Sequence, residues 1–219
     1  MIFLTSKSGN AYGTHQTIVR LHCPACHHKG TFEQVHSDVK DFCVGIKDSS
    51  LEHYTFGQRR CPDPNCAALI FFVGEPGTNK ILLTYPSERI TFDTTDIPEQ
   101  IKNCLEEAIT CHANNCYVAA AIMVRKTLEE LCSYQNATGN NLKERIKSLG
   151  TKIVLPQELI EGLDELRLLG NDAAHIESQA FHKVEHEEVE TAIEFTKEVL
   201  KATFQFSTLL NRLRALKKP

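Results

Sequence analysis

Two pairs of closely spaced cysteines constrain the fold of this chain more than any other feature. The first pair is Cys23-Pro-Ala-Cys26 and the second is Cys61-Pro-Asp-Pro-Asn-Cys66. Each short turn can present two sulfur ligands, and four thiolates complete the tetrahedral shell of a structural zinc ion. Disulfides or unrelated thiols are the alternative, but paired turns of this spacing are typical of zinc sites. The sequence therefore predicts one structural zinc ion bound by Cys23, Cys26, Cys61 and Cys66.

The surroundings of the two pairs add two expectations. Residues 27–60 separate them, a longer gap than a compact zinc ribbon usually has, so this stretch is expected to form strands or an inserted loop. His22, His27 and His28 crowd the first pair and offer imidazole ligands as an alternative to a cysteine. Because four thiolates already complete the shell, we expect these histidines not to bind the metal.

Short stretches rich in β-branched and aromatic residues dominate the first part of the chain. They are bounded by Gly, Pro, Asn and Asp, as strands are, and cover residues 16–22, 31–35, 51–56, 68–73 and 80–85. The pattern then changes period, and Asp96 is placed to cap a helix that starts near Pro98. We therefore expect a zinc-ribbon-like β domain over residues 1–95.

The remainder of the chain has a helical period. Ile101, Leu105 and Ile109 recur at four-residue intervals, and similar apolar stripes follow. The expected helices cover residues 98–113, 115–135, 141–149 (closed by Gly150), one opening at Pro156, and 185–215. The predicted fold class is thus α+β: a small β-rich zinc-ribbon-like domain, then an all-α bundle of four or five helices over residues 98–216.

Charge and hydropathy exclude several classes of protein. The net charge is −4, and neither half of the 219 residues has an excess of Lys and Arg, which disfavours broad binding to nucleic acid duplexes but leaves a small local site possible. No apolar run is long enough to span a bilayer, and the N-terminus lacks a basic start and a cleavage site. We expect a cytoplasmic protein.

Three polar residues recur at steps of four in the second half of the chain. On a helix, Arg167, Asn171 and His175 would share one narrow edge, and Gly170 would let another helix or a ligand approach it. The alternative is a solvated Arg, an Asn near a helix end and a His favoured by the helix dipole. Arg125 is equally open to two interpretations, because Glu129 at i+4 can form a surface ion pair with it.

These residues also carry a resemblance. The run from Arg167 to His175, preceded by the helical segment Val124-Arg-Lys-Thr-Leu-Glu129, resembles a bacterial family of unknown function within the HEPN superfamily of helical bundles. The similarity covers about residues 98–213, and a zinc-ribbon-like segment often precedes the helices in that family. The resemblance implies a dimer that binds RNA or nucleotide and acts in phage defence or restriction. Catalytic members cleave RNA without a metal through an Arg and a His, but Gly170 occupies the expected Arg position.

If the site were catalytic, His175 would act as general base or acid on a ribose 2′-hydroxyl or a leaving oxygen. Arg167, and also Arg125, would stabilise charge on the phosphate, while Asn171 held the phosphate or the imidazole. A homodimer would supply a second histidine, and the stripes over 117–131 and 189–213 offer surplus apolar surface for it. The alternative is a non-catalytic dimerisation or partner-docking module of a defence or restriction complex. The sequence leaves ribonuclease activity open.

Overall fold

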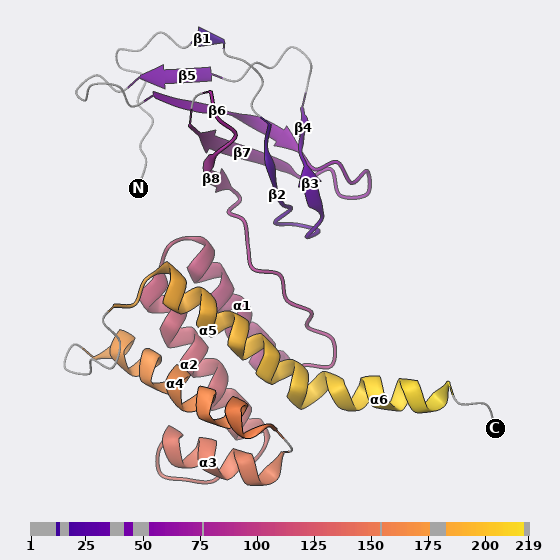
Figure 1. The fold of residues 1–219 in the computed structure, drawn as a ribbon, viewed down its shortest axis with the longest axis vertical. Coiled ribbons are helices and arrows are strands. Elements are labelled where there is room, and N and C mark those ends of the chain that lie inside the picture. The colour runs from indigo at the N-terminus through magenta and orange to yellow at the C-terminus, as the bar shows by residue number, and fades with distance from the viewer. Residues whose placement is uncertain are drawn as a thin grey trace. The chain divides into compact units, whose positions relative to one another are not determined.

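The computed structural model describes residues 12–13, 18–35, 42–45, 53–75, 77–153, 155–175 and 183–216. The chain divides into two compact units, Met1–Arg89 and Ile90–Pro219. The first contains the strands and the second the helices (Figure 1), which confirms the α+β class. The division falls before the expected boundary because Ile90, Phe92 and Ile97 pack on the core of the helical unit. Among the described helices, none is long and apolar enough to cross a membrane.

The β unit is antiparallel. Its larger sheet has the order β1-β5-β6-β7-β8, with β4 also paired to β6, and β2 and β3 form a separate hairpin. The strands are β1 (Tyr12–Gly13), β2 (Arg20–His22), β3 (Lys29–Thr31), β4 (Glu33–Gln34), β5 (Phe42–Gly45), β6 (His53–Arg60), β7 (Leu69–Gly74) and β8 (Ile81–Tyr85). The inserted stretch between the cysteine pairs thus contributes strands, as expected. Of the predicted strand 16–22, residues 16 and 17 lie outside the described part.

Strand β6 extends beyond the predicted end at residue 56. Its last residues, Gln58, Arg59 and Arg60, are polar and gave no strand signal, yet each pairs with β7, and Arg60 lies opposite Leu69. Arg59 is only 1% exposed, and its guanidinium lies 4.7 Å from the centre of the Phe72 ring. A buried cation over an aromatic face stabilises this strand end. The register therefore brings β6 and β7 together up to the second cysteine pair.

The core of the β unit lies directly behind the cysteines. Among the described residues, seven buried residues form this cluster and two of them are cysteines: Val19, Leu21, Cys23, Phe32, Cys61, Ile70 and Phe72. So few apolar side chains contribute little free energy of folding, and small domains of this kind usually need disulfides or a metal. Within the described part of the β unit, the cysteines are therefore part of the core itself.

The described residues of the helical unit form six α-helices, because the last of the predicted helices is divided into two. They are α1 (Glu99–Ala113), α2 (Tyr117–Tyr134), α3 (Leu142–Lys152), α4 (Gln157–Ala174), α5 (His186–Leu200) and α6 (Phe206–Ala215), with a π turn, η1 (Lys201–Gln205), before α6. The cap of α1 is Pro98, not the predicted Asp96. The side chain of Asn141 caps α3, and Glu185 with Glu188 forms a capping box on α5.

Two predictions about helix ends were wrong. Gly150 does not close α3, because its conformation remains helical and the helix continues to Lys152. The last predicted helix is not one continuous α-helix, because the π turn divides it into α5 and α6. Such a turn adds one residue to a helical turn and is frequent at functional positions.

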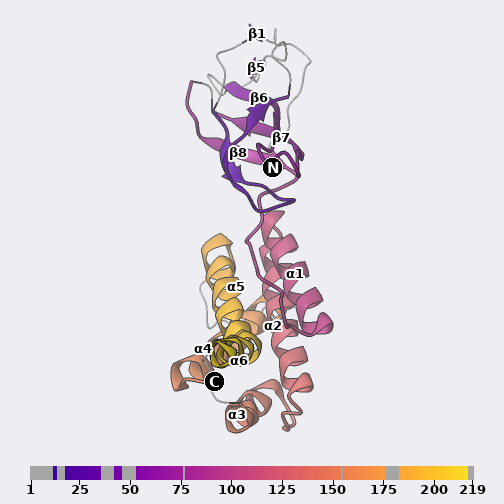
Figure 2. The ribbon, with the colours of Figure 1, turned by 90° about the vertical axis from the view of Figure 1, so that its right-hand side faces the viewer.

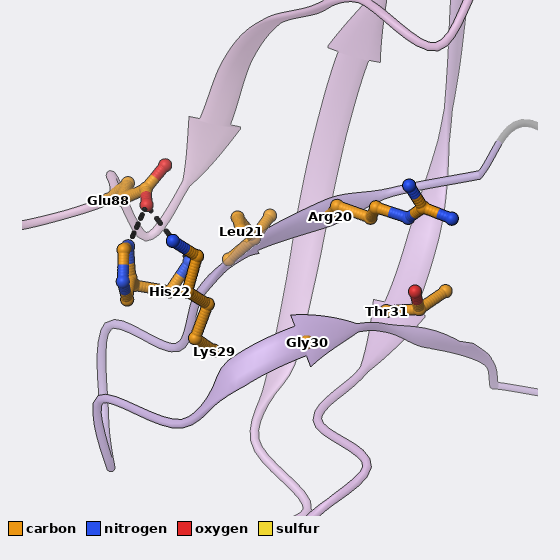
Figure 3. A pocket seen from close by; sticks show the side chains of 7 residues that line it. All are labelled: Arg20, Leu21, His22, Lys29, Gly30, Thr31 and Glu88. Carbon is orange, nitrogen blue, oxygen red and sulfur yellow. Dashed lines mark hydrogen bonds and ion pairs between the residues drawn. The ribbon is translucent and has the colours of Figure 1, made fainter.

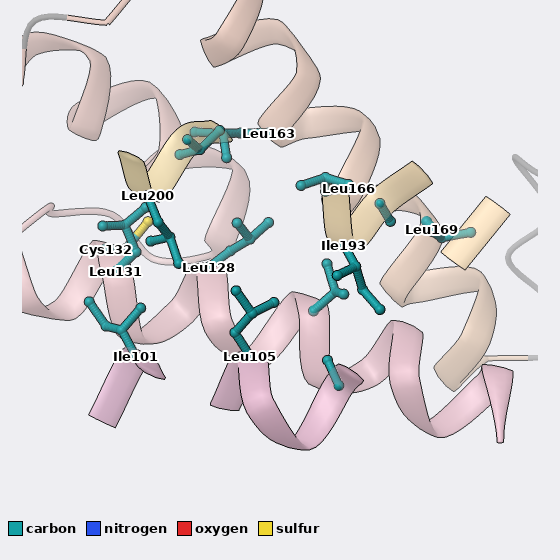
Figure 4. Packing of buried hydrophobic residues seen from close by; sticks show 14 of the residues in the cluster. Ile101, Leu105, Leu128, Leu131, Cys132, Leu163, Leu166, Leu169, Ile193 and Leu200 are labelled. Carbon is teal, nitrogen blue, oxygen red and sulfur yellow. The ribbon is translucent and has the colours of Figure 1, made fainter. Parts of the chain in front are cut away.

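Helix α2 lies at the centre of the bundle, in contact with α1, α3, α4 and α5. Figure 4 shows the packing, to which these helices contribute Ile101, Leu105, Leu128, Leu131, Leu163, Leu166, Ile193 and Leu200. The stripe of α2, with Val124, Leu128 and Leu131, is fully buried in the core of the chain itself, and so are Val189 and Ile193 of α5. These parts of the two stripes therefore offer no surplus surface for a dimer. The end of the predicted last helix, which is α6, does leave apolar residues exposed, with Leu209 at 60% and Leu213 at 62%. On α2, Val118, Ile122 and Tyr134 are exposed outside the buried stripe.

Candidate metal centre and helical site

The four predicted cysteines come together at the ends of two hairpins. Cys23 and Cys26 lie between β2 and β3, and Cys61 and Cys66 lie between β6 and β7. All four Sγ atoms lie within 4.8 Å of one another, with 3.8 Å between Cys23 and Cys66 and 3.7 Å between Cys26 and Cys61. A tetrahedral ion with metal–sulfur bonds of about 2.3 Å places its sulfurs about 3.8 Å apart. The cysteines are positioned to hold a metal ion, whereas a disulfide needs about 2.05 Å.

The two turns share a backbone design. The residue after the second cysteine of each turn is left-handed: φ is 61° at His27 and 46° at Ala67. The first cysteine of each turn donates its N–H across the turn, from Cys23 to the His28 carbonyl at 2.9 Å and from Cys61 to the Ala68 carbonyl at 2.8 Å. These bonds close both turns, so that paired sulfurs face the same point.

The protein environment acts in opposite directions on two of these thiols. Burial raises the pKa of Cys61 to about 12. Burial also raises the pKa of Cys23, but hydrogen bonds from the backbone amides of Cys26 and Ala25 outweigh it, and the net pKa is lowered. Desolvation disfavours a thiolate, and a bound cation opposes that effect. The donor set therefore fits a cation that binds soft, deprotonated sulfur.

A basic face, which was not predicted from the sequence, lies beside the first cysteine pair. On the β2–β3 hairpin, Arg20 is paired with Thr31 and His22 with Lys29, so these four share one face while Leu21 points into the core. They line a pocket of about 450 Å³ together with Leu21, Gly30 and Glu88 (Figure 3). The available signal was the alternation of Arg20 and His22 around a buried leucine.

Glu88 holds His22 in this face. One carboxylate oxygen accepts from the backbone N–H of His22 at 2.9 Å and lies 2.8 Å from its Nδ1, as the dashed lines in Figure 3 mark. Among the described residues, the group suited to a metal contains the four cysteines alone. The side chain of His22 therefore interacts with the Glu88 carboxylate and is not part of the cysteine cluster.

At the helical edge, Gly170 explains how α2 and α4 approach each other. A Cβ atom at Gly170 would lie 2.5 Å from Cβ of Arg125. Above this contact, Nη1 of Arg125 donates to Oδ1 of Asn171 at 2.6 Å and to the Arg167 carbonyl at 3.4 Å. The Nε of Arg125 lies 3.3 Å from a carboxylate oxygen of Glu129. Arg125 thus combines the anticipated i+4 ion pair with a link to α4.

The side chains of Arg167 and His175 take no part in that link. Nε of Arg167 donates to Asp164 at 2.6 Å, and this hydrogen bond lowers the pKa of the aspartate. Helix α4 ends at Ala174, and His175 follows in an extended conformation with φ −135° and ψ 122°. The expectation that all three residues share one helix edge was therefore wrong for His175. Its N–H donates to the Asn171 carbonyl at 2.9 Å, while its side chain is exposed.

Comparison with known proteins places the helical unit in a family. No curated protein and no solved structure gave a significant match. A family described as a domain of unknown function, DUF4145, matches residues 106–217. This match is 112 of the 219 residues and runs from within α1 through α6, without reaching the β unit. The chain therefore belongs to the DUF4145 family.

Proposed function

We propose that the protein is a zinc-stabilised binding protein for RNA or nucleotide, with a helical unit of the HEPN type. The observation that carries the proposal is the basic face of the β2–β3 hairpin, which surrounds a pocket beside the metal centre. Phosphate is the chemistry that RNA and nucleotides share. Binding rather than catalysis is the function that this geometry supports best.

Zinc is the metal that best fits the four cysteines. Four thiolates at tetrahedral spacing favour zinc over hard cations such as magnesium and calcium, which prefer oxygen ligands. A shell of four protein ligands leaves no position for substrate, so the ion would be structural. Bound zinc supplies free energy of folding to small units, and Cys23 and Cys61 already belong to the core of this one.

The charges around the pocket support binding of an anion. Arg20 and Lys29 form no ion pair with any residue that the structure describes, and the single lining carboxylate, Glu88, is engaged by His22. A guanidinium can contact phosphate through two N–H groups, and an ammonium adds a point charge. A site with two cations also agrees with a net charge of −4, which disfavours a long phosphate track.

The helical edge supports a structural role more than a catalytic one. Arg125 is bound to Asn171 and Glu129, and Arg167 is bound to Asp164, so both guanidinium groups already have partners within the protein. Catalysis would require them to exchange these partners for a phosphate, at a cost in desolvation and in lost packing. The link between α2 and α4 favours the non-catalytic interpretation, while a setting in phage defence or restriction rests on the motif resemblance.

The test is a binding titration with a labelled single-stranded RNA and, separately, with ATP, at low salt. We expect Arg20→Ala combined with Lys29→Ala to weaken binding at least about tenfold, since each charge-assisted contact contributes about 1.5–3 kcal/mol. Arg60→Ala is the matched control, because Arg60 lies in the same unit but pairs with Glu33 at 3.0 Å. Binding unchanged in the double variant but lost in Asn171→Ala or His175→Ala would move the site to the helical edge.

The same preparations separate binding from cleavage. We expect RNA incubated with the protein to remain intact. Cleavage that disappears in His175→Ala would instead establish the ribonuclease. Absence of any binding to RNA or ATP at low salt would replace the proposal with the partner-docking alternative.

A further inference from the structure

Helix α6 carries an apolar stripe that no other part of the described chain covers. Its members are 45–80% exposed and comprise Phe206, Leu209, Leu210, Leu213 and Leu216. At about 100° per residue these positions span roughly 120° of the helix surface. Arg212 falls on one side of the stripe and Arg214 on the other. The helix is therefore amphipathic, with a cation along each border of its apolar face.

The direction of α6 is fixed at its base. Nε2 of Gln205 donates to the carbonyls of Asp93 and Thr95, at 2.9 and 3.0 Å. Apart from these two hydrogen bonds, the only described helix or strand that α6 contacts is the adjoining π turn. Figure 1 shows α6 projecting past the other helices as a continuation of α5, and Figure 2 shows it nearly end-on. Phe206 and Leu209 line a pocket with Asp93, Thr95 and Asp96 at the base of the helix, whereas Leu213 and Leu216 are 62% and 80% exposed.

A groove of complementary character lies between α4 and α5. It has a volume of about 280 Å³, and its apolar lining includes Leu166, Leu169, Ala192 and Phe195. Glu165 lies on its α4 side and Glu188 on its α5 side. Gly162 allows the ring of Phe195 to approach α4, because any Cβ there would collide with that ring. The groove is therefore apolar at its floor with a carboxylate on each border.

We propose that α6 of one copy of this chain occupies the α4–α5 groove of a second copy, which returns the contact. The two arginines that border the stripe would meet the two glutamates that border the groove. The helix cannot reach the groove of its own chain, because it continues α5 away from that groove. Because each copy both gives and receives a helix, a twofold axis relates the two copies. The assembly therefore ends at a dimer and does not extend into a filament.

The size of the contact also favours reciprocity. Specific interfaces bury about 1,200–2,000 Å² in total, which one ten-residue helix in one groove does not supply. Exchange doubles the area and repeats each charge pair. Both complementary surfaces belong to the same chain and to the matched family region, so a second copy is the occupant that the charges favour. This inference does not rest on the binding of RNA or nucleotide.

The first experiment measures the mass of the full-length protein by sedimentation equilibrium across a range of concentrations. We expect a monomer–dimer equilibrium. Leu209→Glu combined with Leu213→Glu should raise the dissociation constant at least about a hundredfold, because each buried leucine is lost twice per dimer. The matched control is Thr208→Glu with Asn211→Glu on the opposite face, which should leave the dissociation constant within about threefold of the original. A wild-type monomer at all concentrations, or equal effects of the two variants, would overturn the proposal.

A charge exchange tests the identity of the contact. One variant reverses the helix, with Arg212→Glu and Arg214→Glu. The other reverses the groove, with Glu165→Lys and Thr191→Lys, and leaves Glu188 in its capping box. Each variant alone should dimerise at least about tenfold more weakly than the original protein. Mixing them should restore dimers, because both contacts of the mixed pair then join opposite charges. Mixtures that dimerise no better than the separate variants would contradict the reciprocal exchange.

Discussion

The β unit and the helical unit achieve stability in different ways. The described core of the helical unit contains 23 buried residues, whereas that of the β unit contains seven, two of which are cysteines. Hydrophobic burial suffices for a helical bundle of that size, whereas in the β unit two of the seven described core residues are themselves candidate metal ligands. The proposed zinc ion would therefore belong to the core of the β unit, whereas the core of the helical unit contains none of its ligands. The two units should therefore respond separately to perturbation.

The largest effect should follow removal of a cysteine ligand. We expect Cys61→Ser to reduce bound zinc from about one ion per chain to near zero, as measured by elemental analysis, and to unfold the β unit. Structural zinc contributes about 10–16 kcal/mol in small zinc domains, so no other single change should be as severe. Cys116→Ser is the control, because Cys116 is exposed at the start of α2. Full zinc content in Cys61→Ser would refute the assignment of that ligand.

A smaller effect should be confined to the helical unit. Gly170→Ala places a Cβ 2.5 Å from that of Arg125, and such overpacking costs about 1–3 kcal/mol. Gly150→Ala is matched to it, because its Cβ would lie 3.5 Å from Ile160 in ordinary contact, and the helix gains up to about 1 kcal/mol. In thermal melts at 222 nm, Gly170→Ala should melt below Gly150→Ala, with zinc content unchanged in both. The opposite order would show that α2 and α4 do not meet as described.

The smallest effect should be a pH dependence within the helical unit. Burial lowers the pKa of His112, the nearby His186 lowers it further, and Glu190 raises it. A lowered folded pKa means that the unfolded chain binds the proton first, so stability falls as pH drops below about 6.5. The melting temperature of the original protein should therefore fall more between pH 7.5 and 5.5 than that of His112→Gln. Equal falls would show that His112 does not titrate in this range.

Much of the helical unit was predictable because its signals are local. Periodic apolar residues and prolines located α1, α2 and α4 within a few residues. The π turn and the continuation of α3 through Gly150 were not predicted, because neither follows from the apolar period of the sequence. For the same reason, the stripe of α2 was misread as surplus surface, although α1 and α4 cover it. Local period identifies an apolar face but does not identify its partner.

The cysteine cluster was the most predictable part of the candidate sites, because spacing alone brings each pair of sulfurs together. The link between Arg125 and Asn171 could not be predicted, since 46 residues separate them and α2 must first pack against α4. The end of α4 at Ala174 likewise removed His175 from the expected edge. The basic face of the hairpin escaped notice because it requires the register that pairs His22 with Lys29.

Hydrogen exchange followed by mass spectrometry, with and without a zinc chelator, tests the central claim most directly. The account predicts that the chelator removes protection from backbone amides of β2, β3, β6 and β7, whose hairpins hold the cysteines. Amides of α1, α2, α4 and α5 should keep their protection, because their core contains no ligand of the metal. Unchanged protection in the β unit, or equal loss in the helices, would contradict the account.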